Sequence, residues 1–212
     1  MVTIALYNLK GGVGKTAATI NLAYLSAKQG YKTLIWDLDP QGSSSFYLGA
    51  TANIKNEAKK ILTGEMDLAT AIQPSAYENL DIIPADLSAR HADILLNEMK
   101  QSKKKISAIL STIKNEYDIV FLDCPPGISV LHDAVFAGVD WILMPNIPTT
   151  LSIRSFESVL NYFKENDLDT SKLKCFFSMV DHRKNLHHEV INEFYKDKLF
   201  FKSYIPYLSD VE

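Results

Sequence analysis

The chain has 212 residues, of which 47% are hydrophobic and 22% are charged, and its formal net charge is -3. These values are typical of one water-soluble globular domain, and they do not by themselves predict a nucleic-acid partner. No apolar run approaches the roughly 18 residues of a membrane-spanning helix, and the two cysteines, Cys124 and Cys175, are too few for a disulfide scaffold or a CxxC metal site. We therefore expect one cytoplasmic domain over residues 1–212, without a membrane partner.

Apolar runs rich in β-branched and aromatic residues predict seven strands along the chain. The predicted strands are Thr3–Asn8, Thr33–Leu38, Leu80–Pro84, Ile119–Asp123, Trp141–Met144, Cys175–Val180 and Ser203–Ile205. Most of them are continuously hydrophobic, as expected for parallel strands that are covered on both faces.

Helical segments are predicted between these strands, and Gly30 is suited to end the first of them. The predicted helices are Lys15–Gln29, Asn56–Thr63, Leu87–Gln101, Lys104–Lys114, Ile153–Lys164 and His188–Lys196. Alternation of strand and helix predicts an α/β fold: a doubly wound, mainly parallel sheet with helices on both faces.

The carboxyl end departs from this pattern, because few residues follow the predicted strand Ser203–Ile205. A sheet of this kind normally covers its last strand with a helix. Either the fold ends unusually or the chain stops short of its natural terminus. We expect the second, and hence a domain without its carboxyl-terminal helix.

The sequence KGGVGKT, residues 10–16, lies between the first predicted strand and the first predicted helix. Glycines let a backbone curl so that its N–H groups point at phosphate oxygens, and the following helix adds its positive end. Lys15 would meet the β- and γ-phosphates, and the Thr16 hydroxyl would bind Mg²⁺. An unliganded turn is the plain alternative, and the standard pattern has glycine where this chain has Leu9.

Carboxylates follow two of the predicted strands, at the edge that would carry this loop. Asp37 and Asp39 lie two residues apart in WDLDPQG, so the period of a strand places them on one face. Asp123 ends IVFLDCPPG in a Walker B arrangement, where a carboxylate can hold Mg²⁺ through a water molecule. A lone Asp at a strand end is usually a turn residue, but three at one edge favour a metal site.

Together, the motifs KGGVGKT, DLDPQG (37–42) and DCPP (123–126) resemble the ParA/MinD family of P-loop ATPases, which carry a deviant Walker A motif. The D-x-D-P-Q-G form is similar to the ParA branch, which partitions plasmids, chromosomes and other cargo. The segments DIIPADLSA (81–89) and SMVDHRKNL (178–186) are also shaped like parts of ParA proteins. The resemblance extends to about residue 206.

The resemblance implies ATP and Mg²⁺ as cofactors and a sandwich homodimer that forms when ATP is bound. Lys10 is the signature lysine, which reaches across the dimer to the partner's nucleotide as an arginine finger does. Catalytic roles are implied for Lys10, Lys15 and Asp39, and Asp39 positions the attacking water. Metal-site roles are implied for Thr16, Asp37 and Asp123. Hydrolysis is slow until a partner protein stimulates it.

Other contacts are implied by the resemblance, at the phosphates and at the base. The expected nucleotide-binding residues are Lys10, Gly11, Gly12, Val13, Gly14, Lys15, Thr16 and Ala17, with Met179, Asp181 and Pro206 near the adenine.

ParA proteins bind DNA without sequence specificity, so we expect nucleoid association and a basic DNA-binding surface. The candidates are Lys172, Lys174, Arg183 and Lys184, with Lys196, Lys198 and Lys202 as a further cluster. Several such side chains on phosphates would give salt-dependent affinity. The plain alternative is that exposed lysines are only solvated surface.

Three other functions compete with DNA segregation through a ParB-like partner. A cargo adaptor could replace ParB, so that the chain positions a protein assembly. A MinD-like regulator would bind membranes through an amphipathic terminal helix, which this sequence lacks. A cluster carrier or biosynthetic ATPase of the same superfamily is disfavoured, because Cys124 has no matching second cysteine nearby.

Overall fold

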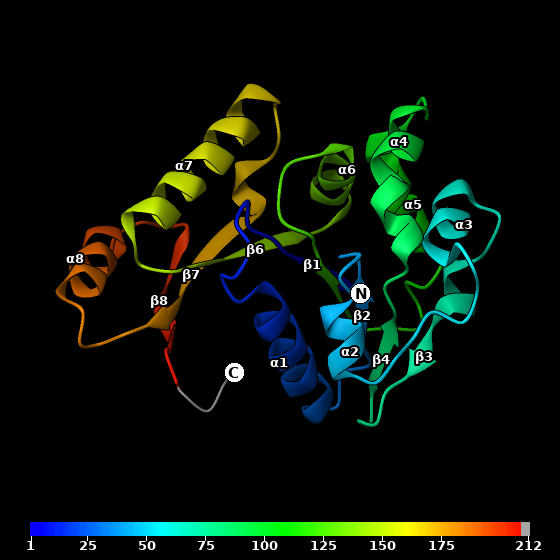
Figure 1. The fold of residues 1–212 in the computed structure, drawn as a ribbon, viewed down its shortest axis with the longest axis horizontal. Coiled ribbons are helices and arrows are strands. Elements are labelled where there is room, and N and C mark those ends of the chain that lie inside the picture. The colour runs from blue at the N-terminus through cyan, green and yellow to red at the C-terminus, as the bar shows by residue number, and fades with distance from the viewer. Residues whose placement is uncertain (209–212) are drawn as a thin grey trace.

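The computed structural model describes residues 1–208, and a single eight-stranded sheet forms its centre (Figure 1). The strands are β1 (Val2–Leu6), β2 (Thr33–Asp37), β3 (Gln73–Pro74), β4 (Leu80–Ile83), β5 (Ile119–Asp123), β6 (Trp141–Asn146), β7 (Leu173–Val180) and β8 (Phe200–Pro206). Their order is β3-β4-β2-β5-β1-β6-β7-β8, and only the β3–β4 pair is antiparallel. The predicted doubly wound, mainly parallel sheet is confirmed.

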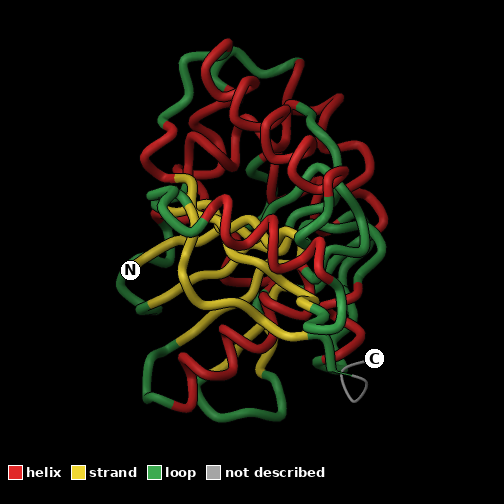
Figure 2. The backbone as a smooth tube through the Cα atoms, turned by 90° about the vertical axis from the view of Figure 1, so that its left-hand side faces the viewer, coloured by secondary structure: helices red, strands yellow, loops and turns green. Residues whose placement is uncertain are grey.

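Helices cover both faces of the sheet, most of them on one side (Figures 1 and 2). The α-helices are α1 (Lys15–Lys28), α2 (Ser43–Tyr47), α3 (Glu57–Thr63), α4 (Ala92–Asn97), α5 (Lys105–Ser111), α6 (Val130–Gly138), α7 (Thr150–Glu165) and α8 (Asn185–Phe194). Short 3₁₀ turns occupy Leu68–Ala71, Leu87–His91, Ser102–Lys104 and Thr170–Lys172. No helix within residues 1–208 has the length and apolar character needed to cross a membrane.

Two hydrophobic cores lie on opposite faces, as the alternation of side chains along a strand requires. In β2, Leu34 and Trp36 pack into the larger core with residues of α3 to α8. Ile35 points the other way, into the smaller core beneath α1. There Ala23 and Ala27 let α1 lie close to the strands, because their side chains are small.

The register of the central strands brings their carboxyl ends to one edge. Asp123, the last residue of β5, pairs with Leu6 of β1 on one side and with Asp37 of β2 on the other. The segments that leave these strands therefore start side by side, which is where a doubly wound sheet carries its binding site.

The structure differs from the predicted elements where side chains from distant segments override local pattern. The predicted helix Leu87–Gln101 is a 3₁₀ turn followed by the short α4. Asp86 and Ser88 bind each other and accept hydrogen bonds from the backbone of α3, which fixes a non-helical start. Helices α2 and α6 and strand β3 were not predicted, since α2 is serine-rich and α6 is apolar nearly all round.

Strand β8 is longer than the predicted Ser203–Ile205, which lies within it. It begins at Phe200, whose ring packs against Phe156, Phe177 and Phe194 from three other elements. This aromatic cluster fixes the start of the strand, so its position depends on contacts that the local sequence does not contain.

Candidate functional site

The loop between β1 and α1 forms a curled cradle. Gly12 and Gly14 have φ angles of 70° and 90°, a region that glycine adopts readily and other residues rarely do. Nothing lies within 4 Å of the position that a Cβ would take on Gly11 or Gly12. Within residues 1–208, no protein group accepts a hydrogen bond from the N–H groups of residues 11–14. These free donors before a helix start suit a polyanion such as a phosphate chain.

Lys15 begins α1, and its side chain turns back into the loop. Its Nζ donates a hydrogen bond to the carbonyl oxygen of Lys10 at 3.0 Å, and only 7% of the residue is exposed. Burial lowers the pKa of Lys15, whereas the carboxylates of Asp123 and Asp39 act in the opposite direction. The ammonium group is thus held beside the free N–H groups. Lys10 itself is half-buried, and Ala17 is exposed at the start of the helix.

Asp123 is buried at the end of β5 and is surrounded by hydroxyl groups. Its carboxylate accepts hydrogen bonds from Thr16 at 2.8 Å and from Ser44 at 2.7 Å, and Thr19 lies at 3.4 Å. Burial raises the pKa of Asp123, and the hydrogen bonds from Ser44 and Thr16 oppose that rise. The predicted neighbours Thr16 and Asp123 are therefore in direct contact.

Asp37 is equally buried, one strand away. Its Oδ2 accepts hydrogen bonds from the backbone N–H of Ser45 at 2.9 Å and from the Ser45 hydroxyl at 2.7 Å. Burial raises the pKa of Asp37 to about 6, despite these hydrogen bonds. The Ser45 hydroxyl also accepts a hydrogen bond from the N–H of Ala85, so it ties β2 to the segment after β4.

Asp39 does not lie on the strand with Asp37, contrary to the prediction from strand period. Strand β2 ends at Asp37, and the following backbone folds so that the N–H of Asp39 donates to the Asp37 carboxylate at 3.2 Å. Asp39 is half-buried, and its own carboxylate accepts a hydrogen bond from the N–H of Gln41 at 3.0 Å. The turn leaves Asp39 closer to solvent than either strand-end carboxylate.

These groups fit a Mg²⁺-nucleotide by their chemistry. Thr16, Asp37 and Asp123 offer hard oxygen atoms, which Mg²⁺ prefers while keeping several of its water molecules. Lys15 and the open N–H groups offer positive charge and donors on the adjoining side. Ser44 and Ser45 were missed from the sequence, although the run SSS directly after DLDPQG placed three hydroxyls beside the acidic motif.

The predicted adenine residues gather at the carboxyl ends of β7 and β8. The side chain of Met179 lies 3.7 Å from the Cβ position of Gly14, and its φ angle of 53° marks an irregularity in β7. Val180, between Met179 and Asp181, pairs with Pro206 of β8. Ser178 donates a hydrogen bond to the carbonyl oxygen of Val13 at 2.8 Å, which fixes β7 against the curled loop.

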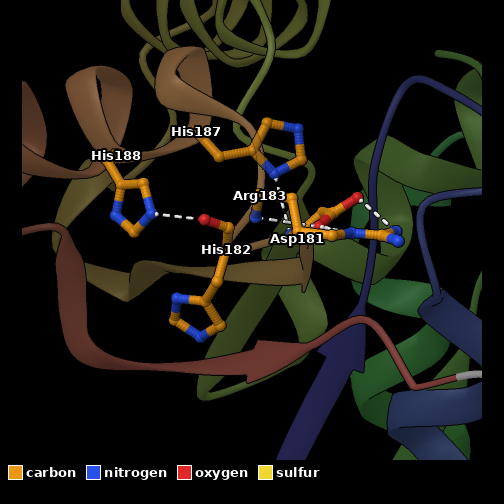
Figure 3. Close-up of polar contacts among 5 residues, drawn as sticks. All are labelled: Asp181, His182, Arg183, His187 and His188. Atoms are coloured by element: carbon orange, nitrogen blue, oxygen red, sulfur yellow. Dashed lines mark hydrogen bonds and ion pairs between the residues drawn. The ribbon is translucent and has the colours of Figure 1, made fainter.

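An ion pair shapes the turn between β7 and α8 (Figure 3). Both guanidinium contacts of Arg183 go to Asp181, at 2.9 and 3.0 Å, and they hold the pKa of Asp181 well below its usual range. His187 accepts a hydrogen bond from the N–H of Asp181, and His188 reaches the carbonyl oxygen of His182 (Figure 3). Within the described residues 1–208, no group of three His, Cys, Asp or Glu residues could hold a metal ion.

The four DNA-binding candidates do not form one patch. Arg183 and Lys184 are exposed at the carboxyl end of β7. Lys172 and Lys174 lie at its amino end, roughly 25 Å away for a strand of this length. Lys172 donates to the carbonyl oxygens of Phe136, Ala137 and Val139 at the end of α6, and Lys174 donates to that of Lys198.

Comparisons with known proteins show the family and the fold that this chain shares. A family model described as an AAA domain matches residues 1–174. The sporulation initiation inhibitor protein Soj of Bacillus subtilis (strain 168) is 31% identical over 211 residues, which cover 96% of this chain and 83% of that protein.

Two solved structures share the fold at low identity. A plasmid partition protein from Borrelia burgdorferi matches with a TM-score of 0.83 and 22% identity, covering 99% of this chain and 91% of that one. Cobyrinic acid a,c-diamide synthase from Mycobacterium smegmatis, with bound ATP analogue and magnesium, matches with a TM-score of 0.88 and 22% identity, covering 100% and 89%. The fold alone therefore serves unrelated reactions.

Proposed function

Because the chain belongs to the ParA family of P-loop ATPases, we propose that it is an ATP-driven partitioning or positioning protein. It binds ATP with Mg²⁺, forms a sandwich dimer with a second copy, binds DNA without sequence specificity and so associates with the nucleoid. A ParB-like or cargo-adaptor protein resets the cycle by stimulating hydrolysis. The observation that carries the proposal is the curled loop of residues 10–16, whose Thr16 contacts the buried carboxylate of Asp123 at the end of β5.

In this proposal, the residues of one copy hold the nucleotide. The N–H groups of residues 11–14 and the Lys15 ammonium bind the phosphates, and the present contact between Lys15 and the Lys10 carbonyl gives way. Thr16 and Asp123 hold Mg²⁺, Asp123 through a water molecule, and Asp37 supports that water shell. Magnesium-bound ATP supplies the phosphoryl group that is transferred to water.

Lys10 and Asp39 complete the site at the surface where the copies meet. Lys10 is half-buried on the loop, and its side chain reaches the partner's nucleotide to neutralise charge in the transition state. Asp39 is more accessible than Asp37 or Asp123, which suits a group that orients the attacking water. Removal of Asp39 is expected to stall the cycle in the ATP-bound dimer.

Arg183 and Lys184 are the better-placed DNA contacts, because both are exposed at the edge that carries the nucleotide site. A change of nucleotide or of dimer state there can alter their surroundings directly. Lys172 and Lys174 remain predictions, but they lie at the opposite edge and already bind backbone carbonyl groups.

Fluorescence anisotropy on an arbitrary DNA duplex tests the proposal. The protein should be the Asp39→Ala variant, titrated first with ATP and Mg²⁺ and then with ADP. We expect binding with ATP only, and we expect the affinity to fall steeply as salt is raised. Equal binding with both nucleotides would contradict a nucleotide switch.

Absence of DNA binding by a protein that dimerises would point to the MinD-like alternative, which liposome sedimentation with anionic lipids then tests. If DNA binding is confirmed, stimulation of hydrolysis by a ParB-like protein distinguishes DNA segregation from the positioning of a protein cargo.

A further inference from the structure

The loop that follows Asp123 is held mainly through its carbonyl groups, and Gly127 adds one N–H. It runs from Pro125 to Ser129 and connects β5 to α6. Pro125 and Pro126 have no N–H to donate, so this loop has few ways to fix its own backbone. Its position must be set by side chains from other elements, and two buried residues supply them.

His132 of α6 holds the two ends of the loop. Its Nε2 lies 3.0 Å from the carbonyl oxygen of Pro125, and its Nδ1 lies 2.8 Å from the Ser129 hydroxyl. A carbonyl oxygen can only accept, so Nε2 carries the proton and Nδ1 accepts from Ser129. The ring is only 2% exposed and makes one hydrogen bond at each nitrogen.

Tyr7, directly after β1, holds the middle of the loop. Its hydroxyl donates a hydrogen bond to the carbonyl oxygen of Gly127 at 2.9 Å, and the residue is fully buried. Its ring packs against that of His132, with centroids 5.1 Å apart. The N–H of Gly127 in turn donates to the carbonyl oxygen of Leu9 at 3.2 Å.

These contacts join two loops that are far apart in sequence. Leu9 directly precedes Lys10 and Tyr7 lies two residues before Leu9, and Gly127 lies in the connection that leaves the Asp123 strand. A displacement of the Pro125–Ser129 loop is therefore transmitted to the backbone at Lys10. We propose that Tyr7 and His132 are positioning residues, which set the two loops in the arrangement that a second copy of the chain must meet.

This inference rests on the proposed function, because it assigns the pair to the ATP-dependent dimer. Neither residue makes a hydrogen bond to residues 11–16, Asp37 or Asp123. Loss of the pair should therefore weaken dimer formation while nucleotide affinity is kept. A purely structural role would weaken both, or neither.

The test uses Tyr7→Phe and His132→Leu, each combined with Asp39→Ala so that hydrolysis does not remove the dimer. We expect the dissociation constant of the ATP-bound dimer, measured by analytical ultracentrifugation, to rise about tenfold, because a buried carbonyl loses its donor. We expect the affinity for a fluorescent ATP analogue to stay within about twofold of Asp39→Ala alone. His132→Gln, whose amide N–H can still reach Pro125, should restore most of the dimerisation.

Tyr162→Phe is the matched control. The Tyr162 hydroxyl donates to the carboxylate of Asp133 at 2.7 Å. This variant therefore loses a tyrosine hydrogen bond to α6, the helix that carries His132, and keeps every bond to the loop. Its dimerisation should be unchanged. Equal weakening by Tyr162→Phe, or unchanged dimerisation in Tyr7→Phe, would overturn the inference.

A readout without nucleotide separates this inference from the proposed function. If the Asp39→Ala protein itself fails to dimerise, the proposed function fails, and amide hydrogen exchange then tests the pair alone. Faster exchange at Gly127 to Ser129 in Tyr7→Phe, but not in Tyr162→Phe, supports the coupling of the two loops. Unchanged exchange there overturns it.

Discussion

Polar side chains are held differently at two places along the carboxyl edge of the sheet. One place is its centre, at β2 and β5, and the other is its β7–β8 end. At the centre, Asp37 and Asp123 are 2% and 1% exposed, a buried serine hydroxyl binds each of them, and Thr16 also binds Asp123. At the β7–β8 end, Arg183 is exposed, and a single ion pair with Asp181 sets its orientation. Buried and crowded groups are fixed before a ligand arrives, whereas exposed groups stay free to change partners.

This difference predicts where substitutions act most strongly. At the centre, a substitution removes a charged side chain that solvent cannot replace, and the side chains that were hydrogen-bonded to it lose their partner. At the β7–β8 end, solvent replaces much of what is lost, since exposed ion pairs contribute little.

The largest effect is expected for Lys10→Ala, on the loop at the centre. Partner-stimulated ATP hydrolysis should fall about 10³-fold or more, as for the loss of an arginine finger. Nucleotide affinity should be retained, because the N–H groups of residues 11–14 and the Lys15 ammonium hold the phosphates in this proposal. The Lys10 N–H is already bound to Asn8. Phosphate release and binding of a fluorescent ATP analogue measure the two effects separately. Normal turnover in this variant would exclude a role for Lys10 in trans.

Asp37→Asn should raise the unfolding free energy of the metal-free protein. Folding raises the pKa of Asp37 from 3.8 to about 6, so the ionised carboxylate destabilises the folded state above pH 6, and this penalty disappears as pH falls towards 4. The shift corresponds to about 3 kcal/mol at pH 7.5. The gain from Asp37→Asn should be smaller than this, because an amide nitrogen cannot accept the hydrogen bonds that Asp39 and Ser45 donate. Urea unfolding of both proteins between pH 4 and 7.5 measures the difference.

Asp39→Asn is the control, since it removes a charge at the same edge but outside the buried strand end. Its stability gain should be less than half that of Asp37→Asn. A pH-independent difference between Asp37→Asn and the wild type would show that buried charge is not the cause.

The sequence predicts some of the side chains at the centre of the edge and misses others. The motifs locate Lys15, Thr16 and Asp123 because loop and strand-end chemistry is local and its spacing is fixed. Ser44 and Ser45 escape such reasoning, because a serine in a turn is normally solvated and only the packing of α2 buries these two. The split of the basic candidates follows from sequence as well, because the predicted strand Cys175–Val180 lies between Lys174 and Arg183 and the structure keeps a strand there.

The smallest effects are expected for the basic residues, and they sharpen the contrast between the two edges. Arg183→Ala should weaken DNA binding by the ATP-bound dimer about fivefold and reduce its salt dependence by about one phosphate contact. Lys172→Ala should leave DNA binding unchanged and instead lower the unfolding free energy by about 1 kcal/mol, because Lys172 binds the carbonyl groups that end α6. DNA anisotropy and urea unfolding on both variants decide this. The reverse pattern would place the DNA surface at the amino edge.

The most direct test of the account is the mass of the Asp39→Ala protein by size-exclusion chromatography with light scattering, in Mg²⁺ with ATP and then with ADP. Lys15→Ala in the same background is the control and should stay monomeric, because it cannot hold the phosphates. The account predicts twice the chain mass with ATP and the single chain mass with ADP. A protein that binds ATP yet remains monomeric would contradict the sandwich dimer.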